Sequence, residues 1–238
     1  MSVLFSHFDR IYVINLAFRA DRRREINAQL KRVDRSLEHE QVVLFDAIRP
    51  DDGGDFPSIG GKGCFMSHLG VLKDMQTKGY RRILIVEDDA DFTTHFLSPD
   101  PEIDQALREQ DWGLFYFGYS LADTCKVTGD RPLGKVAPED NLGLTHGMGI
   151  DQSIVNDIIP YFEAMAARPG GHPKGGPMQI DGAYSWFRKD HPAVLTLATR
   201  NQLMIQRPSA TDIHPHTWRE KLPLIKVLRR VKSRMKRI

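Results

Sequence analysis

The feature of this sequence that most constrains its fold is an apolar segment that runs directly into three acidic residues. Residues 82–86 read Arg-Ile-Leu-Ile-Val, and Glu87, Asp88 and Asp89 follow without a break. Continuous β-branched and aliphatic runs of this length are typical of strands that are covered on both faces, as in parallel sheets flanked by helices. The segment therefore predicts a central strand whose carboxyl end carries acidic side chains.

Two further strands and two helices are predicted ahead of this segment. From the apolar runs and the helical spacing of apolar residues, the expected elements are strands at 11–16 and 41–45 and helices at 21–33 and 63–78. Asp21 is expected to cap the first helix, and residues 50–61, rich in Gly, Pro and Asp, are expected to form a loop. This order predicts an α/β fold with a mostly parallel sheet, in which ligands bind beyond the carboxyl ends of the strands.

The second half of the chain is less regular. Its expected elements are strands at 112–117, 142–150 and 193–198, helices at 153–167 and 181–187, and loops at 119–142 and 168–177. Pro160 is expected to kink or split its helix, because proline has no backbone N–H to donate. A length of 238 residues fits one domain, expected over 1–217, followed by a tail over 218–238.

The tail differs from the rest of the chain in charge. Residues 218–238 contain nine basic residues and one acid, a net charge of +8, whereas the whole chain carries only +2. From residue 223 the apolar residues recur at spacings of four and three, which predicts an amphipathic helix with basic flanks. Such a helix binds anionic lipid surfaces, and the alternatives are a nucleic-acid arm or a helix that docks on protein. The aromatic and glycine signals of nucleic-acid binding are missing, so we expect a membrane surface and no nucleic acid as partner.

The remaining composition indicates a cytoplasmic chain. No apolar run reaches the roughly 18–20 residues that span a bilayer, and residues 1–10 lack the pattern of a signal peptide. Two cysteines, Cys64 and Cys125, do not make a disulfide scaffold. We expect a cytoplasmic protein with reduced thiols, placed by its tail at the inner face of the cytoplasmic membrane.

The acidic triplet suggests a divalent cation. Three adjacent carboxylates repel one another, and a cation or a hydrogen-bond network among them relieves that repulsion. Because side chains alternate along a strand, Glu87 and Asp89 are expected to face one side and Asp88 the other. Two hard oxygen ligands on one side could hold Mg²⁺ or Mn²⁺. The alternative is a solvated acidic turn that caps the next segment.

Three motifs in order give the chain a family resemblance. They are Ile14-Asn15-Leu16 with Arg19 and Asp21-Arg22-Arg23, then Gly63-Cys64 with Ser67-His68, then Glu87-Asp88-Asp89. In this order and at these spacings the chain resembles glycosyltransferase family 25, which includes bacterial lipopolysaccharide galactosyltransferases and collagen galactosyltransferases. The motifs cover about the first 90 residues of the chain.

The resemblance implies a fold, a reaction and a metal. The fold is a single nucleotide-sugar transferase domain of the GT-A type, and the reaction moves a hexose, usually galactose, from a UDP-sugar to an acceptor hydroxyl with inversion. The acidic motif takes the role of the metal-binding D-x-D, so that Asp89 and Glu87 are the expected ligands of Mn²⁺ or Mg²⁺. Glu87 or Asp88 is also expected to face the ribose, and Asn15 of the first motif the donor.

An inverting transfer needs one carboxylate to remove the proton of the acceptor hydroxyl. Asp181 is the first candidate, because it follows a flexible loop and precedes two aromatic residues, Tyr184 and Trp186, of the kind that line sugar sites. Its alternative role is to cap a helix. Asp151 is the second candidate for the base.

Other residues of the motifs are candidates with structural alternatives. Arg19 and Arg23 lie where the first strand turns into its helix, a natural place to meet a diphosphate, although both could be solvated. Ser67 and His68 are candidates for donor contact, with a structural histidine as the alternative. Cys64 is interpreted as a small core residue.

Near the carboxyl terminus, His214 or His216 could complete a metal shell, or both could lie in a surface loop. The segment 206–209 before them could close over the diphosphate. Two other functions compete with the transferase: a metal-dependent phosphohydrolase or nucleotidyltransferase, and a non-catalytic module that binds nucleotide sugars. The sequence alone leaves the acceptor, expected to be a saccharide or lipid-linked saccharide, and the identity of the hexose open.

Overall fold

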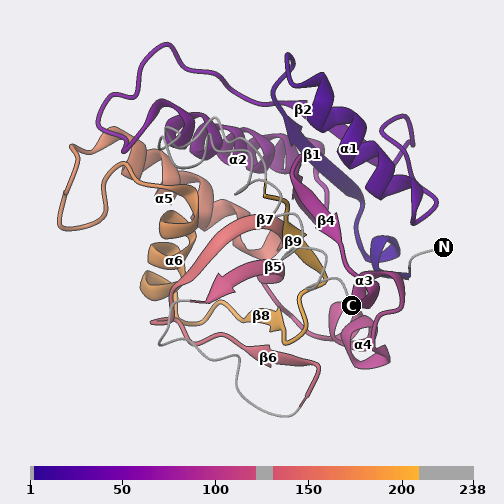
Figure 1. Ribbon diagram of the computed structural model, residues 1–238. Helices are drawn as coiled ribbons and strands as arrows, with labels where there is room; N and C mark the ends of the chain where they lie inside the picture. The colour runs from indigo at the N-terminus through magenta and orange to yellow at the C-terminus, as the bar shows by residue number, and fades with distance from the viewer. Residues whose placement is uncertain (1–2, 122–130, 209–238) are drawn as a thin grey trace.

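The structure, a computed structural model, describes residues 3–121 and 131–208 and contains a seven-stranded central sheet (Figure 1). The strand order is β2-β1-β3-β7-β5-β8-β6. The strands are β1 (Arg10–Asn15), β2 (Val42–Asp46), β3 (Arg82–Glu87), β5 (Leu114–Leu121), β6 (Leu133–Lys135), β7 (Leu142–Asp151) and β8 (Thr196–Thr199). The pairings place β2, β1, β3, β5 and β8 in one direction, with β7 and β6 against them. The predicted α/β class with a mostly parallel sheet is confirmed.

Helices cover both faces of this sheet. They are α1 (Ala20–Lys31), α2 (Ile59–Lys78), α3 (Thr94–Leu97), α4 (Pro101–Glu109), α5 (Val155–Ala167) and α6 (Ile180–Asp190), with short 3₁₀ turns at Val3–His7 and Gln152–Ile154. In β3, Ile83 and Ile85 pack in the core shared with α2, α5 and α6, whereas Leu84 and Val86 pack toward α1 and α4. Figure 1 shows the two groups of helices on opposite sides. This burial on both faces explains the unbroken apolar run of β3.

A second, two-stranded sheet joins distant parts of the chain. It pairs β4 (Ala90–Phe92) with β9 (Met204–Gln206) in antiparallel register, so that Asp91 lies opposite Ile205. Both strands have three residues, too few to show an alternating pattern, and neither was predicted. The pairing brings the segment after the acidic triplet against the last residues that the structure describes.

The helix α2 begins earlier than predicted. It starts at Ile59, four residues before the expected start, because the Ser58 side chain caps it by accepting a hydrogen bond of 2.9 Å from the Gly61 N–H. Gly61 also has a packing reason to be glycine. A Cβ there would lie 2.7 Å from Oε1 of Gln179. Gly60 and Gly61, two of the glycines that indicate a loop in the sequence, therefore belong to the first turn of a helix.

The cap expected at Asp21 is wrong, and of the two outcomes expected at Pro160 the split is wrong and the kink stays a prediction. Asp21 does not cap α1, whose N-cap residue is Arg19 with no capping hydrogen bond from its side chain; Asp21 instead lies in the first turn, and its carboxylate pairs with the Arg19 guanidinium. The helix α5 continues through Pro160 without splitting. Proline there lies in the second turn, so that the bond lost is one near the helix start.

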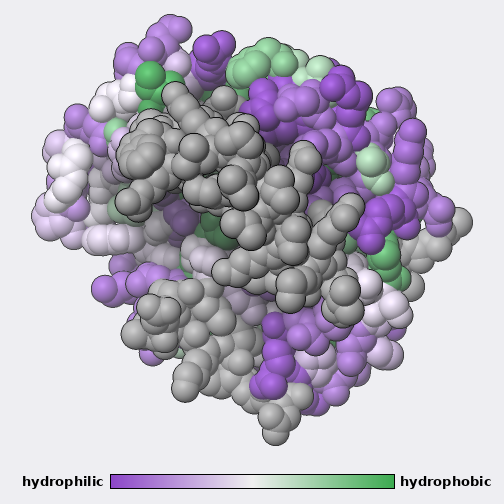
Figure 2. All heavy atoms as spheres, in the orientation of Figure 1, coloured by the Kyte–Doolittle hydropathy of each residue, from purple (hydrophilic) through white to green (hydrophobic). Residues whose placement is uncertain are grey.

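Three predictions concern residues 209–238, which lie outside the described residues: the helix expected from residue 223, the membrane contact of the tail, and the role of His214 or His216. Among the helices that the structure does describe, none has the length and apolarity needed to cross a bilayer. Hydrophilic side chains gather over α1 in the space-filling view (Figure 2), in agreement with the exposed charges of Asp21, Arg24 and Glu25.

Candidate functional site

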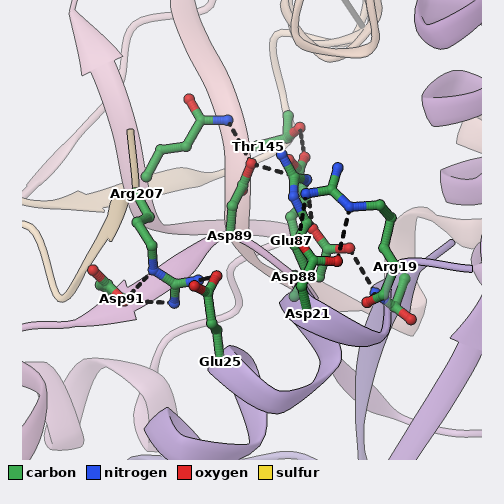
Figure 3. Close-up of polar contacts among 12 residues, drawn as sticks. Arg19, Asp21, Glu25, Glu87, Asp88, Asp89, Asp91, Thr145 and Arg207 are labelled. Atoms are coloured by element: carbon green, nitrogen blue, oxygen red, sulfur yellow. Dashed lines mark hydrogen bonds and ion pairs between the residues drawn. The ribbon is translucent and has the colours of Figure 1, made fainter. Parts of the chain in front are cut away.

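The acidic residues lie where the parallel strands β1 and β3 end side by side, with Ile14 opposite Glu87 (Figure 3). Glu87 is the last residue of β3, Asp88 and Asp89 form the turn that follows, and Asp91 lies in β4. The helix α1 starts just after β1 and borders the cluster. This is the edge of an α/β sheet at which ligands bind, and the predicted location of the cluster is confirmed.

Glu87 points toward α2 and β7. Its Oε1 accepts a hydrogen bond of 2.7 Å from the Thr145 hydroxyl and lies 3.6 Å from Nε2 of His68. Burial of the carboxylate opposes ionisation, but the neighbouring imidazole and the hydroxyl outweigh it and lower the pKa of Glu87. Glu87 is therefore a carboxylate at neutral pH.

Asp88 points toward α1. One oxygen accepts a hydrogen bond of 2.7 Å from the Asn15 amide, and the other accepts one of 2.7 Å from the Arg22 guanidinium. Burial raises the pKa of Asp88 in spite of the Arg22 charge. Asn15, predicted to face the donor, therefore acts on the cluster by holding Asp88.

Asp89 has the least support from its neighbours. It is 6% exposed, its Oδ2 lies 3.3 Å from Arg22 Nη1 and 3.4 Å from the Gln206 amide, and its Oδ1 is buried with no hydrogen-bond partner. Burial and the nearby Glu87 charge raise the pKa of Asp89 to about 7. A buried carboxylate oxygen with no donor beside a second carboxylate fits a divalent cation, so the residues present suit the expected Mn²⁺ or Mg²⁺.

The expected alternation along the strand does not hold beyond Glu87. Arg22 contacts both Asp88 and Asp89, whereas Glu87 turns to Thr145 and His68. The reason is that the strand ends at Glu87 and the next two residues adopt a turn, where the alternating geometry of a strand no longer applies.

The arginines after β1 divide into one buried and two rim residues. Arg22 is 9% exposed and enters the cluster, whereas Arg19 pairs with Asp21 at 2.9 Å and lowers its pKa. Arg23 donates to Oδ1 of Asn15 at 3.2 Å and to the Ala17 carbonyl at 3.1 Å. Arg19 and Arg23, the predicted donor contacts, thus lie at the rim of the site, and Arg22 is the arginine that touches the acids.

Ser67 and His68 lie inside the protein. Ser67 is fully buried, accepts from the Ile48 N–H at 2.8 Å and donates to the Gly63 carbonyl at 2.7 Å. This pairing fixes α2 against the loop after β2, so the Ser67 hydroxyl is engaged by the chain itself and the predicted donor contact stays a prediction. His68 is also fully buried, with Nδ1 at 3.2 Å from the Tyr184 hydroxyl and Nε2 facing Glu87.

The two candidate bases lie at opposite ends of the sheet. Asp181, in the first turn of α6, accepts hydrogen bonds from the N–H groups of Leu144 and Gly182, at 3.1 and 2.8 Å. Because β7 runs against β3, Leu144 lies at the same end as Glu87. The N-cap of α6 is Gln179, so Asp181 is not the helix cap.

Asp151 pairs with Arg82 at 2.7 Å, at the amino end of β3. The structure therefore does not bring this second candidate base together with the acidic cluster. The antiparallel direction of β7 carries its last residue away from the acidic cluster.

Arg207 belongs to the segment expected to close over a diphosphate. It pairs with Asp91 at 2.7 Å and with Glu25 of α1 (Figure 3). The contact ties the end of β9 to the acidic edge of the sheet, so the guanidinium is engaged by carboxylates of the chain itself.

Sequence reasoning missed two kinds of residue around the site. Thr145 contacts Glu87 from β7, a contact between residues 58 positions apart that no local pattern could indicate. Phe18 is 56% exposed, and the Arg49 guanidinium lies 5.1 Å from its ring centre. Phe18 lies between Leu16 and Arg19 of the first motif. The only sequence signal for it was therefore an aromatic residue inside that motif.

Comparison with known proteins supports the motif evidence. Residues 54–128 match the model of glycosyltransferase family 25, described as an LPS biosynthesis protein. Curated relatives include the Homo sapiens inactive glycosyltransferase 25 family member 3, 27% identical over 139 residues, which are 51% of this chain and 23% of the relative. The Danio rerio procollagen galactosyltransferase 1 is 28% identical over 137 residues, 47% of this chain and 21% of the relative.

The chain thus spans less than a quarter of the length of these relatives. Among solved structures, A197 from STIV matches with a TM-score of 0.43 and 12% identity, over 87% of this chain and 97% of the other. A glycosyltransferase involved in glycosylation of the major capsid of PBCV-1 gives 0.44 and 8%, over 84% and 94%. The resemblance of this chain to glycosyltransferase family 25 is confirmed by the family model over residues 54–128 and by curated relatives over about half of the chain.

Proposed function

We propose that this chain transfers a hexose, galactose being the first candidate, from a UDP-sugar to a hydroxyl of a saccharide acceptor, with inversion. The observation that carries the proposal is the acidic cluster at the carboxyl ends of β1 and β3, where Asp89 keeps a buried oxygen without a partner. The description of the matching family and the galactosyltransferase name of a relative support lipopolysaccharide or other cell-surface glycan synthesis as the setting.

Asp89 and Glu87 would hold the Mn²⁺ or Mg²⁺ of this reaction. Such an ion supplies Lewis-acid stabilisation of the charge that develops on the leaving UDP. The chain's own contribution is to keep Glu87 ionised and to hold both ligands in position. Thr145 and His68 orient Glu87, and Arg22 lies beside Asp89.

Asp181 is proposed to remove the proton of the acceptor hydroxyl. The N–H groups of Leu144 and Gly182 hold its two oxygens in place, and each oxygen keeps a further lone pair for the acceptor. Asp181 contacts Leu144, which lies at the end of β7 that is beside the carboxyl end of β3, where Glu87 and Asp89 lie. The acceptor site would therefore lie between α6 and the acidic cluster.

Calorimetric titration with a panel of nucleotide sugars, each with and without Mn²⁺, tests the donor assignment. We expect one UDP-sugar to bind, and expect its binding to need both Mn²⁺ and Asp89. The variant Asp89→Asn keeps the shape and removes the charge, and Asp111→Asn, at an exposed position, is its matched control. A folded protein that binds no member of the panel would rule out the donor assignment.

One observation favours a second function, a module that binds nucleotide sugars without transferring them. Arg22 contacts both Asp88 and Asp89, so a residue of the chain offsets part of the negative charge that a metal ion would otherwise balance. A curated relative is named inactive as well. Donor binding without hydrolysis of the UDP-sugar and without transfer to any saccharide would favour this module over the transferase.

A further inference from the structure

Three potential metal ligands meet on the α2 side of the acidic cluster, away from Asp88. They are Cys64 and His68, one helical turn apart on α2, and Glu87 at the end of β3. One ligand atom of each lies within 4.8 Å of the other two. Residues four apart on a helix lie on the same face, which explains how α2 presents a sulfur and a nitrogen to the same carboxylate.

The imidazole of His68 points to this place with an unused atom. His68 is 0% exposed, and its Nε2 is buried with no hydrogen-bond partner, 3.6 Å from Oε1 of Glu87. Nitrogen and oxygen ligands at 2.0–2.1 Å from a tetrahedral zinc ion lie about 3.4 Å from each other. The spacing of these two atoms is therefore close to that of a metal site, and it is longer than a hydrogen bond.

The groups behind the ligands are also those of a metal site. Nδ1 of His68 lies 3.2 Å from the Tyr184 hydroxyl, so that an N–H on Nδ1 can donate to that oxygen and leave Nε2 free to ligate. Glu87 accepts from Thr145 at 2.7 Å. Metal-ligating histidines and carboxylates are regularly held by such second contacts, which fix the tautomer and the orientation of the ligand.

The local charge attracts a cation to the sulfur. The Glu87 carboxylate lies within 4.8 Å of the Cys64 sulfur, and Asp88 and Asp89 follow it directly in the chain. The same negative charges favour a positive ion beside the sulfur.

We propose that Cys64, His68 and Glu87 form a site for a soft divalent cation such as Zn²⁺. The ligands are the Cys64 sulfur, Nε2 of His68 and one Glu87 oxygen, with a fourth position open to water. Binding releases the thiol proton to solvent and leaves a thiolate on the metal. Sulfur and nitrogen ligands select zinc over Mg²⁺, so this site differs from the hard-cation site proposed at Asp89.

The two sites share Glu87, and zinc bound to this carboxylate would compete with Mn²⁺ or Mg²⁺ for it. The zinc site does not rest on the proposed transferase function, because metal binding alone tests it. Loss of zinc binding and loss of nucleotide-sugar binding are thus separate results.

The test is titration of the full chain with Zn²⁺ by calorimetry and with Co²⁺ by absorbance, in the absence of any nucleotide sugar. We expect one Co²⁺ to give a thiolate-to-cobalt absorption band and one Zn²⁺ to displace it. Cys64→Ser should abolish the band and weaken Zn²⁺ binding by more than about tenfold. Cys125→Ser, which changes the other cysteine of the chain, should leave both unchanged.

Tyr184→Phe is the second variant, since it keeps the ring and removes only the hydroxyl that faces Nδ1 of His68. We expect it to weaken Zn²⁺ binding about 10- to 100-fold and to keep the thiolate band at saturation. Circular dichroism without metal checks that each variant folds, and Cys64→Ala replaces Cys64→Ser if the serine variant does not. The proposal is overturned if the folded wild type shows no thiolate band, or if the band survives in the Cys64 variant.

Discussion

At the scale of single residues, the acidic cluster assigns different states to three adjacent carboxyl groups. Glu87 is stabilised as an anion by His68 and Thr145, whereas Asp89 has burial and a neighbouring anion against it. The raised pKa of Asp89 makes the folded protein hold a proton that the unfolded chain releases at lower pH. An ionised Asp89 therefore lowers the stability of the metal-free protein, and a bound cation would offset that loss.

This difference predicts how stability depends on pH. Because the folded pKa of Asp89 is about 7 and the ordinary value is 3.8, the unfolded chain binds fewer protons between these values, and stability falls as pH rises through that window. Asp89→Asn should therefore raise the stability of the metal-free protein by roughly 2–4 kcal/mol at pH 8 and by little at pH 4. Urea unfolding at both pH values measures this, and equal gains at both would contradict it.

Arg22 gives a second prediction at this scale. Arg22→Met should destabilise the metal-free protein by roughly 3–5 kcal/mol, because it leaves Asp88 and Asp89 buried without the positive charge of the guanidinium. Adding Mn²⁺ should recover part of that loss. Arg24→Met, at an exposed position of the same helix, is the matched control and should change stability by less than about 0.5 kcal/mol. Equal losses for the two variants in urea unfolding would show that Arg22 does not act through the acids.

A third prediction distinguishes the two candidate bases, Asp181 and Asp151, by the effect of their substitution on the transfer rate. Asp181→Asn should lower the transfer rate by about 10²- to 10⁴-fold and leave donor binding unchanged, as expected for a general base that contacts only the acceptor. Asp151→Asn should weaken the ion pair with Arg82 and lower stability, with transfer retained in the folded fraction. Rates under saturating donor and calorimetric donor binding decide between them, and a rate that falls only in the Asp151 variant would reverse the assignment.

At the scale of elements, the sequence predicts the strands that are buried on both faces and the helices that are buried on one face. The strands β1 and β3 are covered on both faces and are therefore continuous apolar runs, and α1 carries Ile26 and Leu30 on a single buried face. The short pair β4 and β9 is fixed by contacts such as Asp91 with Arg207, 116 positions apart, which leave no local pattern. In the site, the motifs located Glu87, Asp88 and Asp89, but the turn after Glu87 decided which way they point.

The start of α2 gives a prediction at the same scale. Ser58→Ala should cost about 1 kcal/mol of stability, because it leaves the Gly61 N–H without its capping oxygen. Donor binding should not change, since Ser58 does not contact the acidic cluster. Ser98→Ala, an exposed serine at the end of α3, is the control and should be nearly neutral in urea unfolding. A Ser58 variant as stable as the control would place the start of the helix nearer the sequence prediction.

At the scale of the whole molecule, charge is divided between an acidic body and a basic end. The tail over 218–238 carries a net +8, so the remaining residues carry −6. An acceptor linked to lipid would bring the acidic site close to a membrane of the same sign, and the tail would supply the opposite charge that holds the protein there.

Removing the tail, residues 218–238, from the chain should therefore abolish its sedimentation with vesicles that contain anionic lipid. The same truncation should leave donor binding in solution unchanged. Binding of the intact chain should fall as salt rises, because the attraction is screened within about 10 Å at 0.1 M salt. Equal sedimentation of the intact and shortened chains would show that the tail does not hold the protein at the vesicle surface, and docking of its basic residues on acidic residues of protein would be the alternative to test next.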